Sequence, residues 1–358
     1  MFVDGLSNKS SCHPVLVLVA IEISTTVIRS SFPTGRAQIV KNLSACRRRN
    51  IYKRTKAINI IDNTMRLPFA LLFVATAVKA FVPTSVTHQS SFGPLKARAT
   101  VEEVPPTPKN NVKIYPDAKS VSDAVRRLVS YSAKKSISER GHFALAIPGG
   151  SILKMLVGDD ILDGVWTSKT TIAYVNHKCV PMDDLALATH AKAKKLFLED
   201  WLGCTVITMD GTSNAKSEAA NYEAKLKALP LDVLPRNEYS GLPVFDLALI
   251  GVGDDGHIGS LYPGRDEVLE ETAWVLPVEM KYPPSITLTL PIMASARQVV
   301  VAACGVSEKY PQGKSDGMRR AVASPTETIK TFPAVGLRPK ATWIMDEAAA
   351  SKLGDTYK

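Results

Sequence analysis

Cysteine is scarce in this sequence, which has 5 cysteines among 358 residues. They are Cys12, Cys46, Cys179, Cys204 and Cys304, and no two form a C-x-x-C pair. Disulfide frameworks and zinc sites need numerous or closely spaced cysteines, so the pattern argues against both. The three cysteines beyond residue 101 have no obvious bridging partners, which is compatible with a reducing compartment.

A basic surface is missing from most of the chain, although the net charge is +10. Of 44 basic and 34 acidic residues, 14 basic and only 3 acidic residues lie within the first 101 positions. The rest of the chain is therefore nearly neutral. A nucleic-acid-binding domain needs clustered positive charge on its folded surface, so no nucleic-acid partner is expected.

The apolar stretch at 67–78 is too short to span a membrane, because a spanning helix needs roughly 20 residues. It follows the basic start Met65-Arg66 and ends in Ala77-Val78-Lys79-Ala80, which supplies small residues of the kind that a signal peptidase reads. Residues 65–80 are therefore predicted to be a signal peptide, and the mature protein is expected to have no membrane segment. No internal repeat is visible in the chain.

Residues 81–100 have the composition of a transit peptide, since they are rich in Ser and Thr, contain Lys96 and Arg98, and lack acids. A signal followed by such a segment, with Phe81 just after the cleavage point, resembles the bipartite presequences of complex plastids. The predicted location is the plastid stroma, with secretion or a cytosolic location as alternatives. The Pro-rich stretch 102–108 is predicted to be a linker, so transit peptide and linker together cover 81–108.

Residues 1–64 precede the predicted signal, although a signal must stand at the amino terminus to be read. We hypothesise that translation begins at Met65 and that the upstream part is an over-extended gene prediction. A genuine, mostly disordered extension is the alternative. Peptides from residues 1–64 in the cell's own protein would disprove the hypothesis.

Residues 109–358 are expected to form one α/β domain. Apolar strands alternate with helical stretches, a pattern typical of a mostly parallel sheet with helices on both faces. We therefore expect a three-layer, Rossmann-like fold. A helix is predicted from Asp117 or Ser120 to Ser136, where apolar residues recur at helical spacing. Strands are predicted at 143–147, 171–175, 205–209, 245–252, 286–290, 299–303 and 341–345, and further helices at 152–156, 187–201 and 217–228.

A glycine-rich turn with two carboxylates and a histidine follows the predicted strand 245–252. Within it, Asp255 and His257 are the candidate catalytic residues, because a carboxylate beside an imidazole can fix its tautomer and raise its basicity. The carboxyl end of a strand in an open α/β sheet is where such a pair would meet a ligand. The plainer interpretation is a surface histidine on a strand-to-loop turn.

The same turn fits the dinucleotide-binding pattern G-x-G-x-x-G at Gly251, Gly253 and Gly256. That pattern requires a helix directly after the third glycine. Pro263 follows too soon for a long helix, and the carboxylates of Asp254 and Asp255 would repel phosphates. The dinucleotide interpretation is therefore not favoured.

A second candidate turn, Gly149-Gly150-Ser151, follows the predicted strand 143–147 and precedes a predicted helix. Backbone N–H groups at such a place bind phosphate well, although Ser151 could instead be an ordinary N-cap. Lys309, with Lys314 near it, is a third candidate for contact with an anion. Two solvated lysines are the alternative there.

These segments in this order resemble the 6-phosphogluconolactonase family, within the group that includes glucosamine-6-phosphate deaminase and ribose-5-phosphate isomerase. The resemblance covers roughly residues 117–353. Its strongest parts are 245–264, then Pro283-Pro284 with 287–291, and then 343–346. The deaminases have Asn and a catalytic Glu where this chain has Leu261 and Tyr262, which favours the lactonase branch.

The resemblance implies hydrolysis of 6-phospho-D-glucono-1,5-lactone to 6-phosphogluconate in the oxidative pentose phosphate pathway, without metal or cofactor. His257 would be the general base and Asp255 would orient it. The substrate would be a small phosphosugar lactone, and the oligomeric state stays open. The implied phosphate-binding residues are Gly149, Gly150, Ser151, Lys178 and Lys309.

Three departures from the family pattern stand beside this resemblance. Asn176-His177-Lys178 replaces the usual Asp-Glu-Arg, and Ser285 replaces an arginine after Pro-Pro. The glycine turn has Ile152-Leu153 in place of Thr-Pro. Lys178 keeps a cation without the bidentate fork of arginine, and His177 could compensate for the lost charge. A non-catalytic or divergent sugar-phosphate-binding relative, a changed lactone substrate, and a deaminase-like isomerase are the alternatives.

Overall fold

The computed structural model describes residues 102–158, 164–306 and 313–357. The predicted extension, signal peptide and nearly all of the predicted transit peptide fall within residues 1–101, outside the described residues, and Lys309 also lies outside them.

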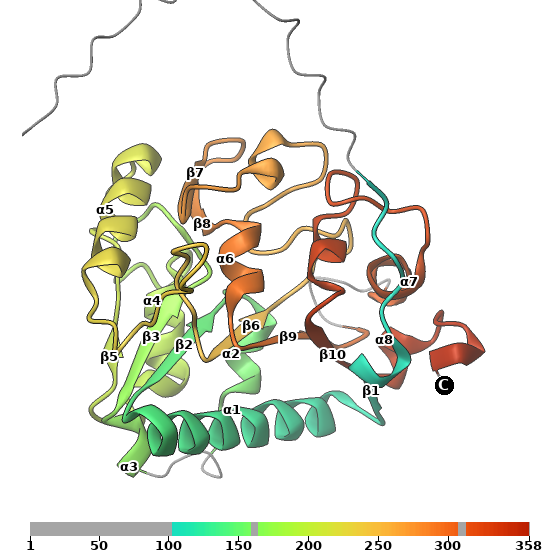
Figure 1. Ribbon diagram of the computed structural model, residues 1–358, viewed down its shortest axis with the longest axis horizontal. Helices are drawn as coiled ribbons and strands as arrows, with labels where there is room; N and C mark the ends of the chain where they lie inside the picture. The colour runs from blue at the N-terminus through green and yellow to red at the C-terminus, as the bar shows by residue number, and fades with distance from the viewer. Residues whose placement is uncertain (1–101, 159–163, 307–312, 358) are drawn as a thin grey trace, which may run out of the picture. The chain divides into compact units, whose positions relative to one another are not determined.

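A parallel sheet of seven strands forms the centre of the described structure (Figure 1). Every neighbouring pair of strands in it runs parallel. The residues of the central strands are buried along their whole length, as expected for a sheet covered on both faces. In spatial order the strands are β1 (Val112–Tyr115), β10 (Ala341–Asp346), β9 (Gln298–Ala303), β6 (Leu247–Ile250), β2 (Phe143–Ile147), β3 (Thr170–Tyr174) and β5 (Thr205–Val206).

A second, smaller sheet is antiparallel and consists of β4 (Asn176–Lys178), β8 (Ser285–Leu288) and β7 (Val275–Val278), in that order. It follows the carboxyl end of β3 in sequence, because only Val175 separates β3 from β4. Helix α5 packs against β7 and β8. The small sheet therefore lies close to the edge of the central sheet where the parallel strands end.

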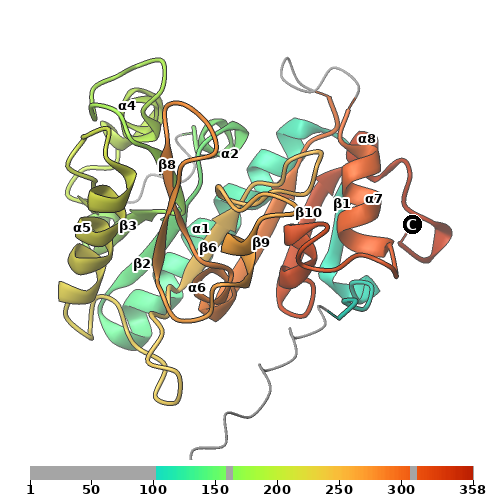
Figure 2. The same ribbon diagram turned by 90° about the horizontal axis from the view of Figure 1, so that it is seen from above.

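Helices cover the central sheet, and the predicted fold class is confirmed. Helix α1 runs along one face, against β2, β9 and β10, and α6 lies on the other side of the sheet (Figures 1 and 2). The α-helices are α1 (Ala118–Arg140), α2 (Ser151–Met155), α3 (Gly164–Thr167), α4 (Thr189–Ala193), α5 (Ala215–Ala228), α6 (Leu290–Ser295), α7 (Ser315–Ala323) and α8 (Glu347–Ala350). Short 3-10 turns are η1 (Lys109–Asn111), η4 (Asp266–Leu269), η5 (Pro333–Leu337) and η6 (Asp355–Tyr357), and η3 (Lys194–Leu198) is a π-helix.

The limits of α1 follow from its end residues. Asp117 caps its start, with a side-chain oxygen that accepts a hydrogen bond from the Ser120 N–H at 2.7 Å. Gly141 ends it in the left-handed conformation, with φ of 81°. The predicted end at Ser136 was too early, because no residue before Gly141 stops the helix, and it continues for another turn.

Several other predicted bounds were wrong. The predicted helix 187–201 is divided into α4 and the π-helix η3, and the predicted strand 205–209 is reduced to the two residues of β5. The short strands β1, β4 and β7 and the helices α6 and α7 were not predicted. Helix α2 is capped by Gly150, so Ser151 is its first residue and not its N-cap.

The Pro-rich segment 102–108 is packed on the body, where the sequence analysis predicted a linker. Val104 N–H donates to the Glu327 carbonyl at 3.1 Å, and Thr107 N–H donates to the Val322 carbonyl at 2.8 Å. The buried guanidinium of Arg338 donates to the carbonyl of Val104. The segment therefore belongs structurally to the domain that follows it.

The strand order places two loops at the switch point, where the chain stops adding strands on one side of β2 and begins to add them on the other. From β2 the chain adds β3 and β5 on one side, and it later places β6 on the other side of β2. The loops that follow β2 and β6 therefore leave neighbouring strands at the same edge. Such switch points are where open α/β sheets bind ligands.

Candidate functional site at the sheet edge

The loop after β6 holds His257 and Asp255 side by side. Nδ1 of His257 lies 2.6 Å from Oδ1 of Asp255, and the same carboxylate oxygen accepts the His257 backbone N–H at 3.1 Å. The His257 side chain is 21% exposed and the Asp255 side chain is 49% exposed. The pair is thus fixed in geometry and reachable from solvent.

The charge of Asp255 sets the tautomer of His257. Partial burial acts to raise the pKa of Asp255, but the hydrogen bonds and charge of His257, with a smaller contribution from the charge of Lys281, outweigh it and lower that pKa to about 2. The carboxylate is therefore ionised at neutral pH and can only accept hydrogen bonds. Nδ1 of a neutral His257 then carries the hydrogen, which leaves the lone pair on Nε2.

The imidazole of His257 packs closely against the backbone of Gly253. A Cβ atom on Gly253 would lie 2.1 Å from Nδ1 of His257 and 2.6 Å from Oδ1 of Asp255. Gly253 N–H donates to the His257 carbonyl at 2.9 Å, which closes the loop. Only glycine leaves room for the ring at this position.

Neighbouring elements hold the loop from outside. The buried Lys314, at the start of α7, donates from Nζ to the Val252 carbonyl at 2.9 Å. The Ala334 N–H donates to the Gly256 carbonyl at 3.0 Å. The ring of Phe332 packs where a Cβ on Gly256 would be, at 2.4 Å. The loop is therefore packed against its surroundings along its length.

An aromatic ring and a cation extend the site beyond His257. The ring of Tyr262 lies with its centre 4.9 Å from that of His257, at an angle of 33°. The ammonium of Lys281, from the loop between β7 and β8, lies 4.0 Å from the centre of the Tyr262 ring. Sequence reasoning did not single out Lys281, because one lysine in a loop has no distinguishing pattern.

The glycine turn after β2 adjoins this loop through Asn176. Oδ1 of Asn176 accepts from the Gly149 N–H at 3.4 Å, and its Nδ2 donates to Oγ of Ser260 at 3.2 Å. Gly150 has φ of 82° and ψ of −146°, a conformation open essentially to glycine alone. The structure therefore brings Gly149, Gly150 and the His257 loop to one edge of the sheet.

Alternation along β4 separates the three residues that depart from the family pattern. Asn176 and Lys178 lie on one face of the strand and His177 on the other. His177 is fully buried, accepts from the His190 N–H at Nε2 over 3.0 Å, and contacts the Lys178 carbonyl through Nδ1. Burial lowers the pKa of His177 to about 4. The suggestion that His177 compensates for the lost cation is therefore wrong.

Lys178 is exposed, and no ion pair joins it to a carboxylate in the described part of the chain. It shares its face of β4 with Asn176, which contacts the glycine turn. Ser151 is also exposed, at the start of α2. Lys309, the remaining predicted phosphate ligand, lies outside the described residues.

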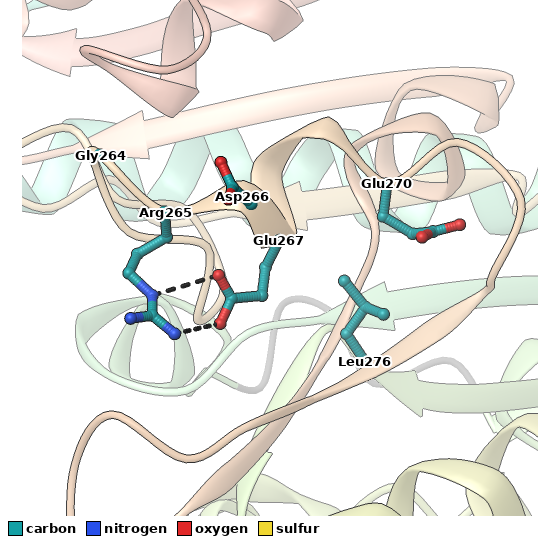
Figure 3. A pocket seen from close by; sticks show the side chains of 6 residues that line it. All are labelled: Gly264, Arg265, Asp266, Glu267, Glu270 and Leu276. Carbon is teal, nitrogen blue, oxygen red and sulfur yellow. Dashed lines mark hydrogen bonds and ion pairs between the residues drawn. The ribbon is translucent and has the colours of Figure 1, made fainter. Parts of the chain in front are cut away.

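An open pocket of about 480 Å³ lies beyond this site and has an acidic lining (Figure 3). Arg265 and Glu267 form an ion pair at 2.6 Å within its lining, and Asp266 and Glu270 also line it. Carboxylates repel an anionic ligand, so this pocket does not suit a phosphorylated sugar. The loops at the ends of β2 and β6 suit one better.

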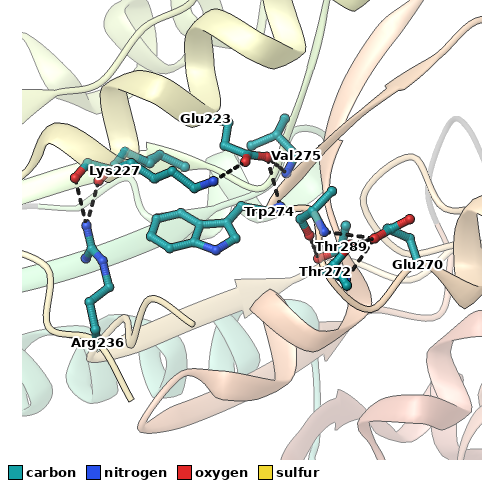
Figure 4. A network of polar contacts seen from close by, with 10 residues as sticks. Glu223, Lys227, Arg236, Glu270, Thr272, Trp274, Val275 and Thr289 are labelled. Carbon is teal, nitrogen blue, oxygen red and sulfur yellow. Dashed lines mark hydrogen bonds and ion pairs between the residues drawn. The ribbon is translucent and has the colours of Figure 1, made fainter. Parts of the chain in front are cut away.

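A polar network anchors the small sheet that carries Lys281 (Figure 4). Glu223 of α5 accepts from the backbone N–H groups of Trp274 and Val275 at 2.9 and 3.0 Å. The Trp274 ring also lies between two cations, with Lys227 at 5.2 Å and Arg236 at 4.7 Å from ring centres. Helix α5 thereby fixes the start of β7.

Within the described residues, no helix is long and apolar enough to cross a membrane. Among the same residues, no group of three or more His, Cys, Asp or Glu side chains is arranged to hold a metal ion.

The fold and site together define a class of α/β proteins that bind small ligands at the switch point of a parallel sheet, where the strand order reverses. The family model described as glucosamine-6-phosphate isomerases/6-phosphogluconolactonase matches residues 116–345, and the chain belongs to this family. The resemblance drawn from the motifs is confirmed.

Curated relatives agree with this assignment, and a solved structure shares the fold. The chain is 28% identical over 256 residues to 6-phosphogluconolactonase 3, chloroplastic, of Arabidopsis thaliana, covering 68% of this chain and 76% of that protein. It is 32% identical over 245 residues to a probable chloroplastic 6-phosphogluconolactonase 3 of Oryza sativa subsp. indica, covering 63% and 72%. The crystal structure of 6-phosphogluconolactonase from Leishmania guyanensis matches with a TM-score of 0.57 at 23% identity, covering 68% of this chain and 98% of that one. This last likeness supports the fold.

Proposed function

We propose that this protein is a 6-phosphogluconolactonase, which hydrolyses 6-phospho-D-glucono-1,5-lactone to 6-phosphogluconate in the oxidative pentose phosphate pathway. The observation that carries the proposal is the 2.6 Å contact between His257 and Asp255 at the switch point of the sheet. Relatives across most of the domain bear the name of this enzyme.

His257 is the general base of the proposed reaction. Its Nε2 takes a proton from a water molecule while the water oxygen attacks C1 of the lactone. The C1–O5 bond then breaks, and the same proton passes from His257 to O5 as it leaves. Asp255 holds the ring and stabilises the imidazolium between the two steps. General acid–base catalysis of this kind contributes on the order of 10²–10⁴-fold.

The substrate phosphate binds at the turn after β2. Gly149, Gly150 and Ser151 supply backbone and hydroxyl donors there, and Lys178 supplies a positive charge from the neighbouring strand. Lys309 is proposed as a further cation. With the phosphate held, the lactone carbonyl faces His257, and this fixed orientation adds to the rate. The chemistry uses side chains and water alone.

The proposed location is the plastid. Several plant relatives that match this chain are named chloroplastic, and the composition of residues 65–100 supports a signal followed by a transit peptide. A fluorescent fusion to residues 65–108, which places the predicted signal at the amino terminus, should accumulate in the plastid stroma. Retention in the cytosol or secretion would contradict the location without touching the enzyme assignment.

A lactonase assay at controlled pH tests the enzymatic proposal. The full-length protein should hydrolyse the lactone well above the spontaneous rate, and it should not deaminate glucosamine 6-phosphate. A protein that only matches spontaneous hydrolysis, yet binds 6-phosphogluconate, would instead be a non-catalytic relative. Activity confined to another lactone would indicate a changed substrate.

A further inference from the structure

The loop between β7 and β8 places Lys281 over the ring of Tyr262, which is itself a neighbour of His257. This loop is anchored where it meets β8, because the Cys179 N–H donates to the Pro284 carbonyl at 2.8 Å. Its other end follows Val278, the last residue of β7, which pairs with Ser285 of β8. Lys281 therefore projects from a loop that is fixed at both ends.

The ring of Tyr262 is a neighbour of both Lys281 and His257. The ammonium of Lys281 lies 4.0 Å from the centre of the Tyr262 ring, and that ring lies 4.9 Å from the imidazole of His257. An aromatic face attracts a cation, so Tyr262 holds the ammonium near the base. No carboxylate forms an ion pair with Lys281 in the described part of the chain.

Two lysines of the site, Lys178 and Lys281, have different neighbours. Lys178 shares a strand face with Asn176, which touches the Gly149 turn. Lys281 stands beside Tyr262 instead, and its charge also acts on Asp255. The first position suits a phosphate, and the second suits charge that develops at C1.

The proposed reaction creates such a charge. When water attacks C1, the carbonyl electrons move onto the carbonyl oxygen, and this oxyanion persists until the C1–O5 bond breaks. His257 holds the proton destined for O5 and Asp255 is itself negative, so neither group is available as a hydrogen-bond donor to the oxyanion. We infer that Lys281 is a further catalytic residue, whose ammonium stabilises the lactone oxyanion. This inference rests on the proposed function.

In the balanced sequence, the proton removed from water resides on His257 while the oxyanion faces Lys281. Collapse of the intermediate restores the C1 carbonyl, breaks C1–O5 and returns the proton from His257 to O5. The resulting carboxylic acid releases one proton to solvent. Lys281 gains and loses no proton in these steps.

Steady-state kinetics of the full-length Lys281→Met, Lys281→Arg and Lys119→Met variants test the inference. Removal of one oxyanion donor typically costs 10²–10³-fold in kcat, so Lys281→Met should lower kcat about 100-fold with KM changed less than about threefold. Lys281→Arg keeps the charge and should retain kcat within about tenfold. Lys119→Met removes an exposed lysine on α1 and should leave both constants unchanged.

The outcomes separate this inference from the proposed function. An unchanged kcat in Lys281→Met overturns it, and so does a rise in KM alone, which would make Lys281 a ground-state phosphate ligand. His257→Ala is measured in parallel. If His257→Ala is inactive while Lys281→Met is normal, the general base stands and only the role of Lys281 falls. If the wild-type protein shows no catalysis, both the proposed function and the role of Lys281 are overturned.

Discussion

Lys178 and Ser285 are direct partners across the antiparallel pair of β4 and β8. These are the two positions at which the sequence lacks the arginines expected from the family pattern. Their side chains share one face, since partners in an antiparallel pair point to the same side. The two departures therefore concern one place in the site, and Lys178 is the cation left there.

Lys178→Met should weaken substrate binding because it removes that cation. The loss of a charged hydrogen bond costs about 1.5–3 kcal/mol, which corresponds to a rise in KM of roughly ten- to a hundredfold. The value of kcat should change little. Ser285→Arg, which adds a cation beside Lys178, should lower KM. An unaltered KM in both variants would remove this face from the phosphate site.

Gly253→Ala should abolish most activity without unfolding the protein. The new Cβ would stand 2.1 Å from Nδ1 of His257, so the ring must move away from Asp255. We expect kcat to fall at least about 100-fold, in line with the loss of general-base catalysis. Gly354→Ala is the matched control, because a Cβ there meets nothing within 4 Å. Equal kcat values in the two variants would contradict the proposal that the His257 ring must pack against Gly253 to act.

His177 should make the protein less stable at mildly acidic pH. Its pKa is lowered to about 4 in the folded state by burial, whereas a histidine in an unfolded chain has a pKa of about 6.5. The unfolded state therefore binds more protons between these values, so stability falls as pH decreases through that window. Urea unfolding between about pH 7 and pH 4 should show this slope, and His177→Gln should reduce it. An equal slope in the variant would contradict the buried, neutral histidine.

Removal of residues up to 108 should destabilise the domain. A chain that begins at Lys109 leaves the buried guanidinium of Arg338 without the carbonyl acceptors of Val104 and Pro105. A buried donor left unsatisfied costs about 1–3 kcal/mol. Urea unfolding should therefore show a lower free energy than for a chain that begins at Glu102. Equal stabilities would support the linker predicted from the sequence.

The sequence was sufficient for the fold class and for the family to which the chain belongs. Long, fully apolar strands such as 143–147 and a helix with an apolar stripe carry strong local signals. The short strand β4 carries none, because three polar residues become a strand only through pairing with β8. Lys281 and Asn176 were missed as parts of the site for the same reason, since tertiary contacts alone bring them to it.

A double-mutant cycle on His257 and Asp255 tests the central claim most directly. Lactonase kcat is measured for the wild type, His257→Ala, Asp255→Asn and the double variant. If Asp255 acts through the imidazole, His257→Ala should remove the catalysed rate, and adding Asp255→Asn should change nothing further. Retention of the wild-type kcat by His257→Ala would contradict the proposed mechanism.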